Sequence, residues 1–188
     1  MKKLKAKITG VSALLCHSGK LADPLYEGTK QLKKLSSKRG KTDADLEMMA
    51  KVEFIHSLYL DNGQPCIPAE VLEASFINAA RRNKQGKKVQ AGVVVPNNYP
   101  LIYDGPRDPE KMWEDGRFRF SSTVRVGTSR VSRMRPRFNE WAADIEVEYD
   151  PNMLNEAEIK EIVKIAGESI GIGDWRPRFG RFKVEFSG

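Results

Sequence analysis

Residues 155–186 read NEAEIKEIVKIAGESIGIGDWRPRFGRFKVEF and contain a helix pattern, a glycine-rich loop and a strand pattern in succession. Asn155 and Glu158 have the spacing of a capping box, which predicts a helix from Asn155 to about Ile170. The alternation in Phe182–Phe186 predicts the last strand. The predicted buried stripe of the helix consists of Ile159, Ile162, Val163, Ala166 and Ile170.

Four further segments complete the predicted core. Lys3–Val11 and Trp141–Tyr149 alternate apolar with charged residues, as half-buried strands do. Ala69–Arg82 has the apolar stripe of a helix, and we expect this helix to end at Gly86. Ala91–Val95 is predicted as a buried strand. The order strand, helix, strand, strand, helix, strand predicts an α+β protein with a ferredoxin-like core, the split βαβ plan that is also RRM-like.

Two more segments have strand patterns. Phe54–Leu60 is predicted as a strand that ends in a hairpin turn at Asp61-Asn62-Gly63. Phe118–Val126 alternates an apolar face, Phe118, Phe120, Val124 and Val126, with an arginine row, Arg117, Arg119 and Arg125. We expect this row to face Asp144, Glu146 and Glu148 across neighbouring strands, each pair contributing about 0.2–1 kcal/mol.

The segment 20–53 interrupts this plan after the first strand. It is lysine-rich and polar, with a short helix predicted at Pro24–Leu35 and helical composition at Asp43–Lys51. A chain of 188 residues is long enough to bury a core. We therefore expect residues 1–188 to form a single domain in which 20–53 is a basic insertion.

The charge distribution favours a polyanionic partner. The chain carries a net charge of +7, and 11 of its 14 arginines fall between Arg107 and Arg181. From Arg117 to Phe138 there are seven arginines and no acidic residue. The planar guanidinium group suits phosphate binding and base stacking, so this pattern indicates nucleic acid more strongly than the net charge does.

The compartment is predicted to be a reducing cytoplasm. Cys16 and Cys66 are the only cysteines, and no apolar signal-peptide region follows the lysines at the start of the sequence. No apolar run approaches the length of a membrane span.

Motifs for nucleotide hydrolysis, zinc proteolysis and paired-cysteine chemistry are absent from the sequence. We predict no cofactor and no metal, since Cys16, His17, His56 and Cys66 lack a standard zinc-ligand spacing. Only His17 and His56 could act as a general base near neutral pH, and His17, in LLCHSG after the first strand, is the catalytic candidate that we favour.

The residues predicted to bind nucleic acid fall into three groups. Arginines beside aromatic rings and a glycine turn offer phosphate attraction together with sequence-tolerant stacking. The glycine-rich loop supplies Gly171, Gly173, Trp175, Arg176, Arg178, Phe179 and Arg181, with amides expected to be free for an anion. The connection Arg130–Arg137 supplies Arg130, Arg133, Arg135 and Arg137, and the basic insertion supplies Lys33, Lys34, Lys38, Arg39 and Lys41.

The chain resembles the RAMP superfamily, the RRM-like RNA-binding proteins of CRISPR effector complexes. The resemblance is carried by the six-element order, by GIGDWRPRFGRF at 171–182 and by PCIPAEVLEASFINAARRN at 65–83. It implies a basic, glycine-rich loop that contacts RNA. It also places His17 nearest to the family's catalytic histidine, without a matching triad, so the non-cleaving backbone subunits are the better analogy. ITGVSALLCHSG at 8–19 further resembles phage-encoded proteins.

The sequence thus predicts a protein that binds RNA or single-stranded DNA without cleaving it. Backbone subunits assemble side by side along RNA, which implies partners that are copies of this chain or other subunits, with Gly28–Lys41 as a contact loop. Two alternatives stay open: a metal-independent endoribonuclease that uses His17, and a viral interaction or inhibitor protein that binds no nucleic acid.

Overall fold

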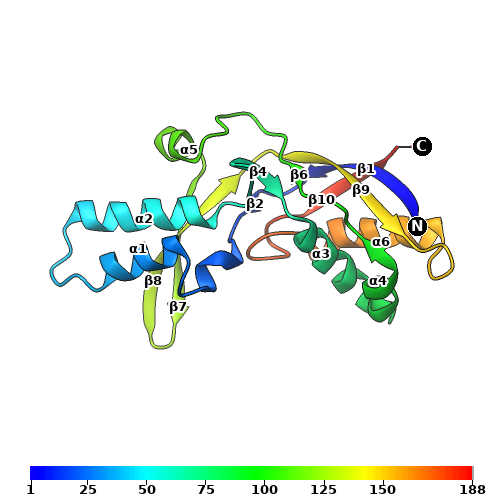
Figure 1. Ribbon diagram of the computed structural model, residues 1–188, viewed down its shortest axis with the longest axis horizontal. Helices are drawn as coiled ribbons and strands as arrows, with labels where there is room; N and C mark the ends of the chain where they lie inside the picture. The colour runs from blue at the N-terminus through cyan, green and yellow to red at the C-terminus, as the bar shows by residue number, and fades with distance from the viewer. Residues whose placement is uncertain (188) are drawn as a thin grey trace. The chain divides into compact units, whose positions relative to one another are not determined.

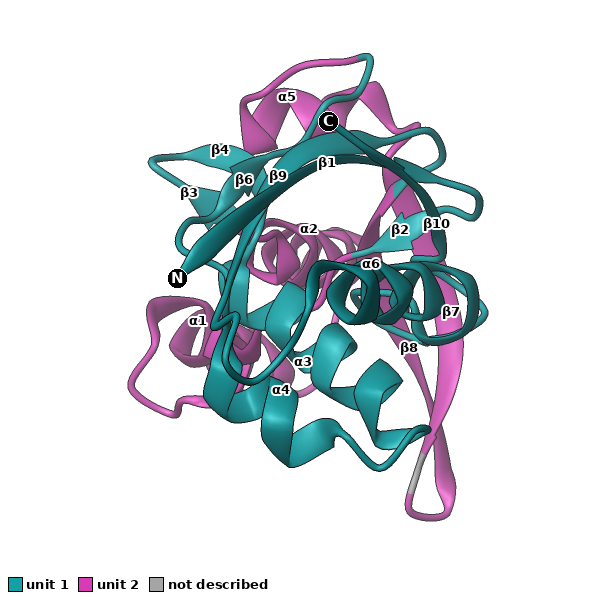
Figure 2. Cartoon of the chain, turned by 90° about the vertical axis from the view of Figure 1, so that its right-hand side faces the viewer, with its two compact units in different colours: residues 1–15, 60–104, 138–188 teal, residues 16–59, 105–137 magenta. Residues whose placement is uncertain are grey.

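The structure is a computed structural model that describes residues 1–187, except for the side chain of Val126. The chain is a mixed α+β protein with antiparallel sheets, as predicted. It divides into two compact units (Figure 2). Unit 1 contains residues 1–15, 60–104 and the chain from 138 onward, and unit 2 contains residues 16–59 and 105–137.

Unit 1 is built on a four-stranded antiparallel sheet in the order β10-β1-β9-β5. Ala6 in β1 lies opposite Ile145 in β9 and Phe186 in β10, which fixes the register. The predicted long strands are confirmed, whereas the strand predicted at Ala91–Val95 shortens to two residues. The bounds are β1 Lys2–Gly10, β5 Val93–Val94, β9 Ala142–Tyr149 and β10 Phe182–Phe186.

Helices cover one face of this sheet (Figure 1). That face is apolar because alternate strand residues such as Leu4, Ala6 and Ile8 are buried while the lysines between them are exposed. Phe76, in the helix Ala69–Arg81, and Ile159, in the helix Glu156–Ile165, are both fully buried in this core. The helices are α3 Ala69–Arg81, α4 Gly86–Gly92 and α6 Glu156–Ile165, followed by the π-helical turn η2 Ala166–Ile170.

Local signals set the helix ends. The predicted capping box is present: Asn155 Oδ1 accepts from the Glu158 N–H at 2.9 Å, and Glu158 Oε2 accepts from the Asn155 N–H at 2.8 Å. The bond that the carboxylate accepts from the Asn155 N–H, followed by the one from Lys88, lowers the pKa of Glu158. Gly86 was expected to end α3, but α3 ends at Arg81 and Gly86 begins α4.

The rest of unit 1 is made of short strands. The hairpin turn predicted at Asp61-Asn62-Gly63 is confirmed, with Asn62 (φ 49°) and Gly63 (φ 76°) both left-handed, as a two-residue hairpin loop requires. The strands are β2 Leu14–Leu15, β3 Leu60–Asp61, β4 Gln64–Ile67 and β6 Tyr99–Pro100.

Unit 2 combines helices with a long β-hairpin. The strand predicted at Phe54–Leu60 is wrong over most of its length, because residues up to Ser57 belong to a helix. Phe54 is fully buried and lies 5.5 Å from the Trp113 ring, so a buried helix stripe produced the short apolar run. The elements are η1 Gly19–Ala22, α1 Glu27–Ser36, α2 Asp43–Ser57, α5 Pro109–Asp115, β7 Arg119–Val126 and β8 Ser129–Phe138, the last residue of which belongs to unit 1.

Candidate nucleic-acid interface

The glycine-rich loop of residues 171–181 lies in unit 1 and connects η2 to β10. Gly173 (φ 79°) and Gly180 (φ 74°) have left-handed backbones. A Cβ on Gly180 would overlap the carbonyl oxygen of Ile172, and one on Gly173 would overlap that of Leu15. Glycine is required at both positions by conformation and by space, because the loop packs directly on its own backbone and on residues 13–15.

Several amides of this loop donate hydrogen bonds within the protein, which corrects the expectation of a free amide at Gly171. The Gly171 N–H donates to Ala166 O at 2.7 Å, the Asp174 N–H to Leu15 O at 2.9 Å and the Gly180 N–H to Ala13 O at 2.8 Å. The Gly171 carbonyl in turn accepts from the Ser75 hydroxyl at 2.9 Å. These bonds hold the backbone of the loop in place, and the amides of Gly171, Asp174 and Gly180 are not available to an anion.

Two aromatic side chains of the loop lie near its surface. Trp175 is 41% exposed, and its ring centroid lies 6.1 Å from that of Phe179 at an interplanar angle of 41°. Trp175 has φ 53°, in the left-handed region, which costs a bulky residue about 1–2 kcal/mol. The loop holds a large, exposed aromatic ring in an unfavourable backbone conformation.

The three arginines of the loop, Arg176, Arg178 and Arg181, are all exposed. In the part of the chain that the structure describes, none of them forms an ion pair. Beside Arg176 and Trp175 the surface forms an open hollow of about 560 Å³, also lined by Asn78 and Ser169. The sequence gives no signal for these last two residues, because other elements bring them to the loop.

The second predicted group, Arg130–Arg137, is part of a strand and not a connection. Val126 pairs with Ser129, so Gly127 and Thr128 form the turn of a β7–β8 hairpin. The interruption by Pro136 concealed this strand in the sequence. The predicted apolar face of β7 is buried at Phe118 and half-buried at Phe120 and Val124, and the placement of Val126 on it lies outside the described side chains.

Glu53 of α2 engages two of these arginines, and sequence patterns gave no indication of it. Its carboxylate accepts from Arg135 Nη1 at 2.8 Å and from the Met134 N–H at 2.9 Å, and Arg133 Nη1 lies 3.7 Å away. The side chains of Glu53 and Arg135 are each only 11% exposed. Arg135 is thus committed to the protein interior, whereas Arg130 is exposed and Arg133 is partly exposed.

Other arginines of the hairpin stack on aromatic rings. The Arg119 guanidinium lies 4.1 Å from the Trp113 ring centroid and Nε donates to the Trp113 carbonyl at 2.6 Å. The Arg137 guanidinium lies 5.2 Å from the Phe120 ring centroid, and its buried Nε has no hydrogen-bond partner among the described residues. Both arginines help to order the hairpin.

The predicted arginine partners of the acidic row on β9 are wrong. The sheet neighbours of β9 are β1 and β5, and the acids pair with lysines of β1. Lys3 Nζ lies 2.7 Å from Glu146 Oε1 and 3.3 Å from Glu148 Oε1, and Lys5 Nζ lies 4.0 Å from Glu146 Oε2. The side-chain hydrogen bond between Lys3 and Glu146 raises the pKa of Lys3 and lowers the pKa of Glu146.

The predicted lysine group lies at the end of α1 and in the following loop. Lys33, Lys34, Arg39 and Lys41 are exposed. Lys38 is different, because its Nζ lies 2.8 Å from Asp45 Oδ1. That bond, followed by those from Thr42, lowers the pKa of Asp45 to about 2 and supports the capping box that begins α2.

The two histidines occupy different settings in unit 2. His17 is exposed, and its carbonyl accepts from the Tyr59 hydroxyl at 3.4 Å. His56, expected in a strand, lies in α2, where Nδ1 is 2.9 Å from the Tyr26 hydroxyl. Burial lowers the pKa of His56, against a smaller opposing effect of Glu27.

Within residues 1–187, no cluster of three or more His, Cys, Asp or Glu side chains is arranged to hold a metal ion. Cys16 and Cys66 are free thiols and both are buried. Among the described helices, none is long and apolar enough to cross a membrane.

No protein-family model matches this chain, and no curated protein matches it. What the chain binds has to be inferred from its own residues.

Proposed function

We propose that this protein binds RNA or single-stranded DNA, without cleaving it, through the loop of residues 171–181. The proposal includes a ferredoxin-like core and membership of the RAMP superfamily. The core is supported by the chain order β1, α3, β5, β9, α6, β10 together with the sheet order β10-β1-β9-β5. A cytoplasmic location, also proposed, is consistent with two free thiols.

One observation carries the proposal: the loop presents an exposed, strained Trp175 beside Phe179, with three exposed arginines that have no ion-pair partner among the described residues. A buried tryptophan would contribute to folding, but this ring remains 41% exposed while its backbone is unfavourable. A base stacked on Trp175 or Phe179 would bring its phosphates near the arginines. Stacking of this kind contributes about 1–3 kcal/mol per base.

The other charged surfaces are weaker candidates for the primary site. The outer face of the sheet presents Lys3, Lys5 and Lys7 opposite Asp144, Glu146 and Glu148, so its charges largely cancel. In the hairpin, Arg135 is neutralised by Glu53. The exposed lysines of α1 add a long-range attraction that salt screens.

The test is binding of about 30-nucleotide fluorescent single-stranded RNA, single-stranded DNA and duplex at several salt concentrations. The variant Arg176→Ala/Arg178→Ala removes two charges from the loop. Lys7→Ala/Lys87→Ala removes two exposed charges elsewhere in unit 1 and serves as the matched control. The slope of log K against log salt should fall by about 1.4 for the loop variant, since each single-strand phosphate contact contributes about 0.7.

Equal slopes for the two variants, with both still folded by circular dichroism, would reject the loop as the site. No binding of any nucleic acid at low salt would reject the function and favour a protein partner for the arginines. Cleavage of the probe that is lost in His17→Ala would favour the endoribonuclease alternative.

A further inference from the structure

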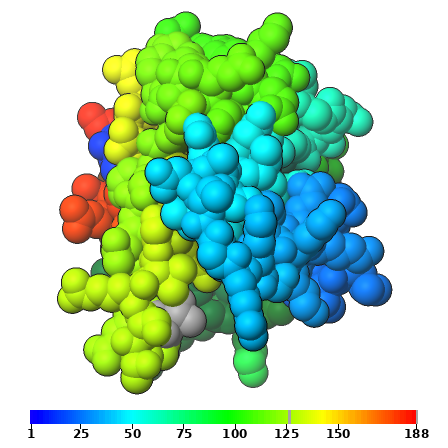
Figure 3. Space-filling view, turned by 90° about the vertical axis from the view of Figure 1, so that its left-hand side faces the viewer, coloured from blue at the N-terminus to red at the C-terminus, as the bar shows by residue number. Residues whose placement is uncertain are grey.

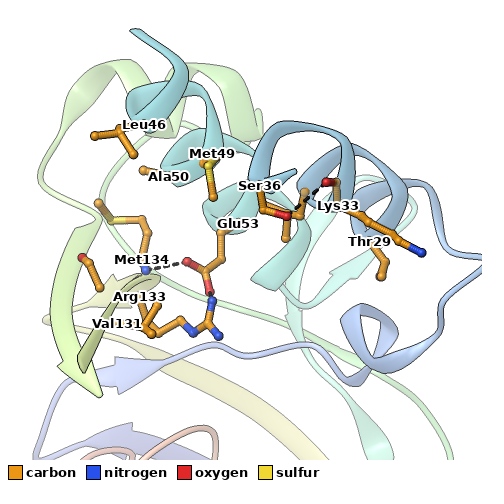
Figure 4. Close-up of a pocket in the computed structure, with 12 residues that line it drawn as sticks. Thr29, Lys33, Ser36, Leu46, Met49, Ala50, Glu53, Val131, Arg133 and Met134 are labelled. Carbon is orange, nitrogen blue, oxygen red and sulfur yellow. Dashed lines mark hydrogen bonds and ion pairs between the residues drawn. The ribbon is translucent and has the colours of Figure 1, made fainter. Parts of the chain in front are cut away.

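Unit 2 contains a groove between α1, α2 and β8, with a volume of about 760 Å³ (Figure 4). Its apolar lining comes from all three elements: Leu32, Leu46, Met49, Ala50, Val131 and Met134. Figure 3 faces this side of unit 2, where α2, in cyan, lies between α1, in blue, and the hairpin, in yellow-green. None of the described segments of the chain fills the groove.

The one carboxylate at the floor of the groove is paired within the protein. The Glu53 carboxylate at the floor accepts from the Met134 N–H at 2.9 Å, which Figure 4 marks with a dashed line, and from Arg135 Nη1 at 2.8 Å, a residue that Figure 4 does not draw. The arrangement also caps the outward edge of β8 at Met134, whose carbonyl accepts from Arg135 Nη1 at 3.1 Å. At Met134, therefore, the backbone groups of β8 are already bonded within the protein and are not open to a partner strand.

The helix α2 is exposed where it borders the groove. Leu46 is 51% exposed, although it lies on the first turns of a helix whose later residues Val52 and Phe54 are buried. Methionine side chains such as Met49 adapt to different partners at low cost. An exposed apolar surface beside a concave apolar lining is typical of an interaction site.

The rim of the groove is basic. Of the residues that line it, Lys33 and Arg133 carry positive charge, and the one acid, Glu53, is neutralised at the floor. Outside the lining the charges are mixed: exposed Lys30, Lys34 and Arg130 lie on α1 and β8, and the exposed acids Glu27, Asp43 and Glu47 lie on α1 and α2, so the charge argument rests on the two basic residues of the lining itself. The two walls formed by α1 and β8 therefore attract a negatively charged partner.

From these features we propose that the groove binds an acidic amphipathic helix of a partner protein. The apolar residues of that helix would pack on Leu46, Met49 and Ala50, and its acidic residues would face Lys33 and Arg133. Glu53 lies seven positions after Leu46 along α2, which is about 10 Å at a rise of 1.5 Å per residue. Partner side chains spaced i, i+4 and i+7 span the same length, which is the pattern by which helices bind apolar grooves.

The experiment uses the full chain and a fluorescein-labelled peptide, ALEEQLEELAEELQ, whose leucines follow this spacing and whose other face is acidic. Fluorescence anisotropy should show saturable binding with a dissociation constant on the order of 10–100 µM, as expected for a small interface. The control peptide ALKKQLKKLAKKLQ keeps the leucines and reverses the charge, and it should bind at least about ten-fold more weakly.

Two protein variants locate the interaction. Leu46→Glu places a charge in the groove, whereas Met48→Glu changes a residue that is 49% exposed on the same helix and does not line the groove. Leu46→Glu should weaken peptide binding about ten-fold or more, and Met48→Glu by less than about two-fold. Both positions are half exposed, so both variants should fold, which circular dichroism checks.

Four results would overturn the proposal: no saturable binding of the acidic peptide, equal loss in the two variants, stronger binding of the basic peptide, or displacement of the peptide by single-stranded RNA. A concentration-dependent dimer that Leu46→Glu abolishes would assign the groove to a second copy of the chain instead. The loop variant Arg176→Ala/Arg178→Ala should lose RNA binding but keep peptide binding. The proposed nucleic-acid site and the proposed groove can therefore be rejected independently of each other.

Discussion

Replacing Glu53 with alanine should lower the free energy of unfolding by about 3–5 kcal/mol, the usual cost of removing one partner from a buried ion pair. The contacts justify the high estimate. The carboxylate accepts from Arg135 at 2.8 Å and from the Met134 N–H at 2.9 Å, and both charged side chains are only 11% exposed. Alanine removes the carboxylate that neutralises the buried Arg135 guanidinium and leaves the Met134 N–H without its acceptor.

Glu53→Gln separates the two contributions. Its amide oxygen can still accept from the Met134 N–H, but the charge that balances Arg135 is gone, so we expect a loss of about 2 kcal/mol. Urea unfolding at pH 7, followed by circular dichroism, measures both variants. In the double variant Glu53→Leu/Arg135→Met most of the loss should be recovered, because neither charge is then buried.

A loss below about 1 kcal/mol for Glu53→Ala would refute the reasoning, since it would mean that water already solvates the pair. A double variant no more stable than Glu53→Ala would also count against it. In that case the buried charge of Arg135 would not be what limits the stability of Glu53→Ala.

Three further predictions concern the loop and His56. Gly180→Ala should destabilise the protein by more than about 2 kcal/mol in urea unfolding, because a left-handed φ and an overlap with Ile172 O act together, and an unchanged midpoint would contradict this. Trp175→Gly should leave stability nearly unchanged by relieving φ 53° while weakening RNA binding about 5–150-fold; equal binding would remove the ring from the site. Burial lowers the pKa of His56 in the folded protein, so the unfolded chain binds a proton at His56 more readily than the folded chain does. The free energy of unfolding should therefore fall as the pH drops below about 6.5, the ordinary pKa of histidine. Urea unfolding of His56→Gln at several pH values should lack this part of the pH dependence.

Much of unit 1 follows from local sequence patterns. The alternation in β1, β9 and β10 and the apolar stripes of α3 and α6 are each contained in one segment, and the side-chain period alone gives the buried face. The Asn155–Glu158 capping box and the turn at Asn62-Gly63 are likewise local, because the atoms that satisfy the backbone lie within three residues.

Unit 2 was predicted less well for physical reasons. The run from Phe54 to Leu60 is short and apolar, which suits a strand or a buried helix equally, and packing against Trp113 decides for the helix. Pro136 and the run of arginines are unfavourable signals for a strand, but pairing with β7 in the hairpin places this segment in a strand, β8.

The sequence by itself determined which residues are arginine, aromatic and glycine in the loop, and therefore what chemistry the loop offers. Only the tertiary structure decided which of those groups are available. The ion pairs join residues that are far apart in the chain. Glu53 pairs with Arg135, 82 residues away, and lysines of β1 pair with acidic residues of β9. Short-range patterns carry no information about such pairs, because Coulomb and hydrogen-bond energies depend on distance in space and not on separation along the chain.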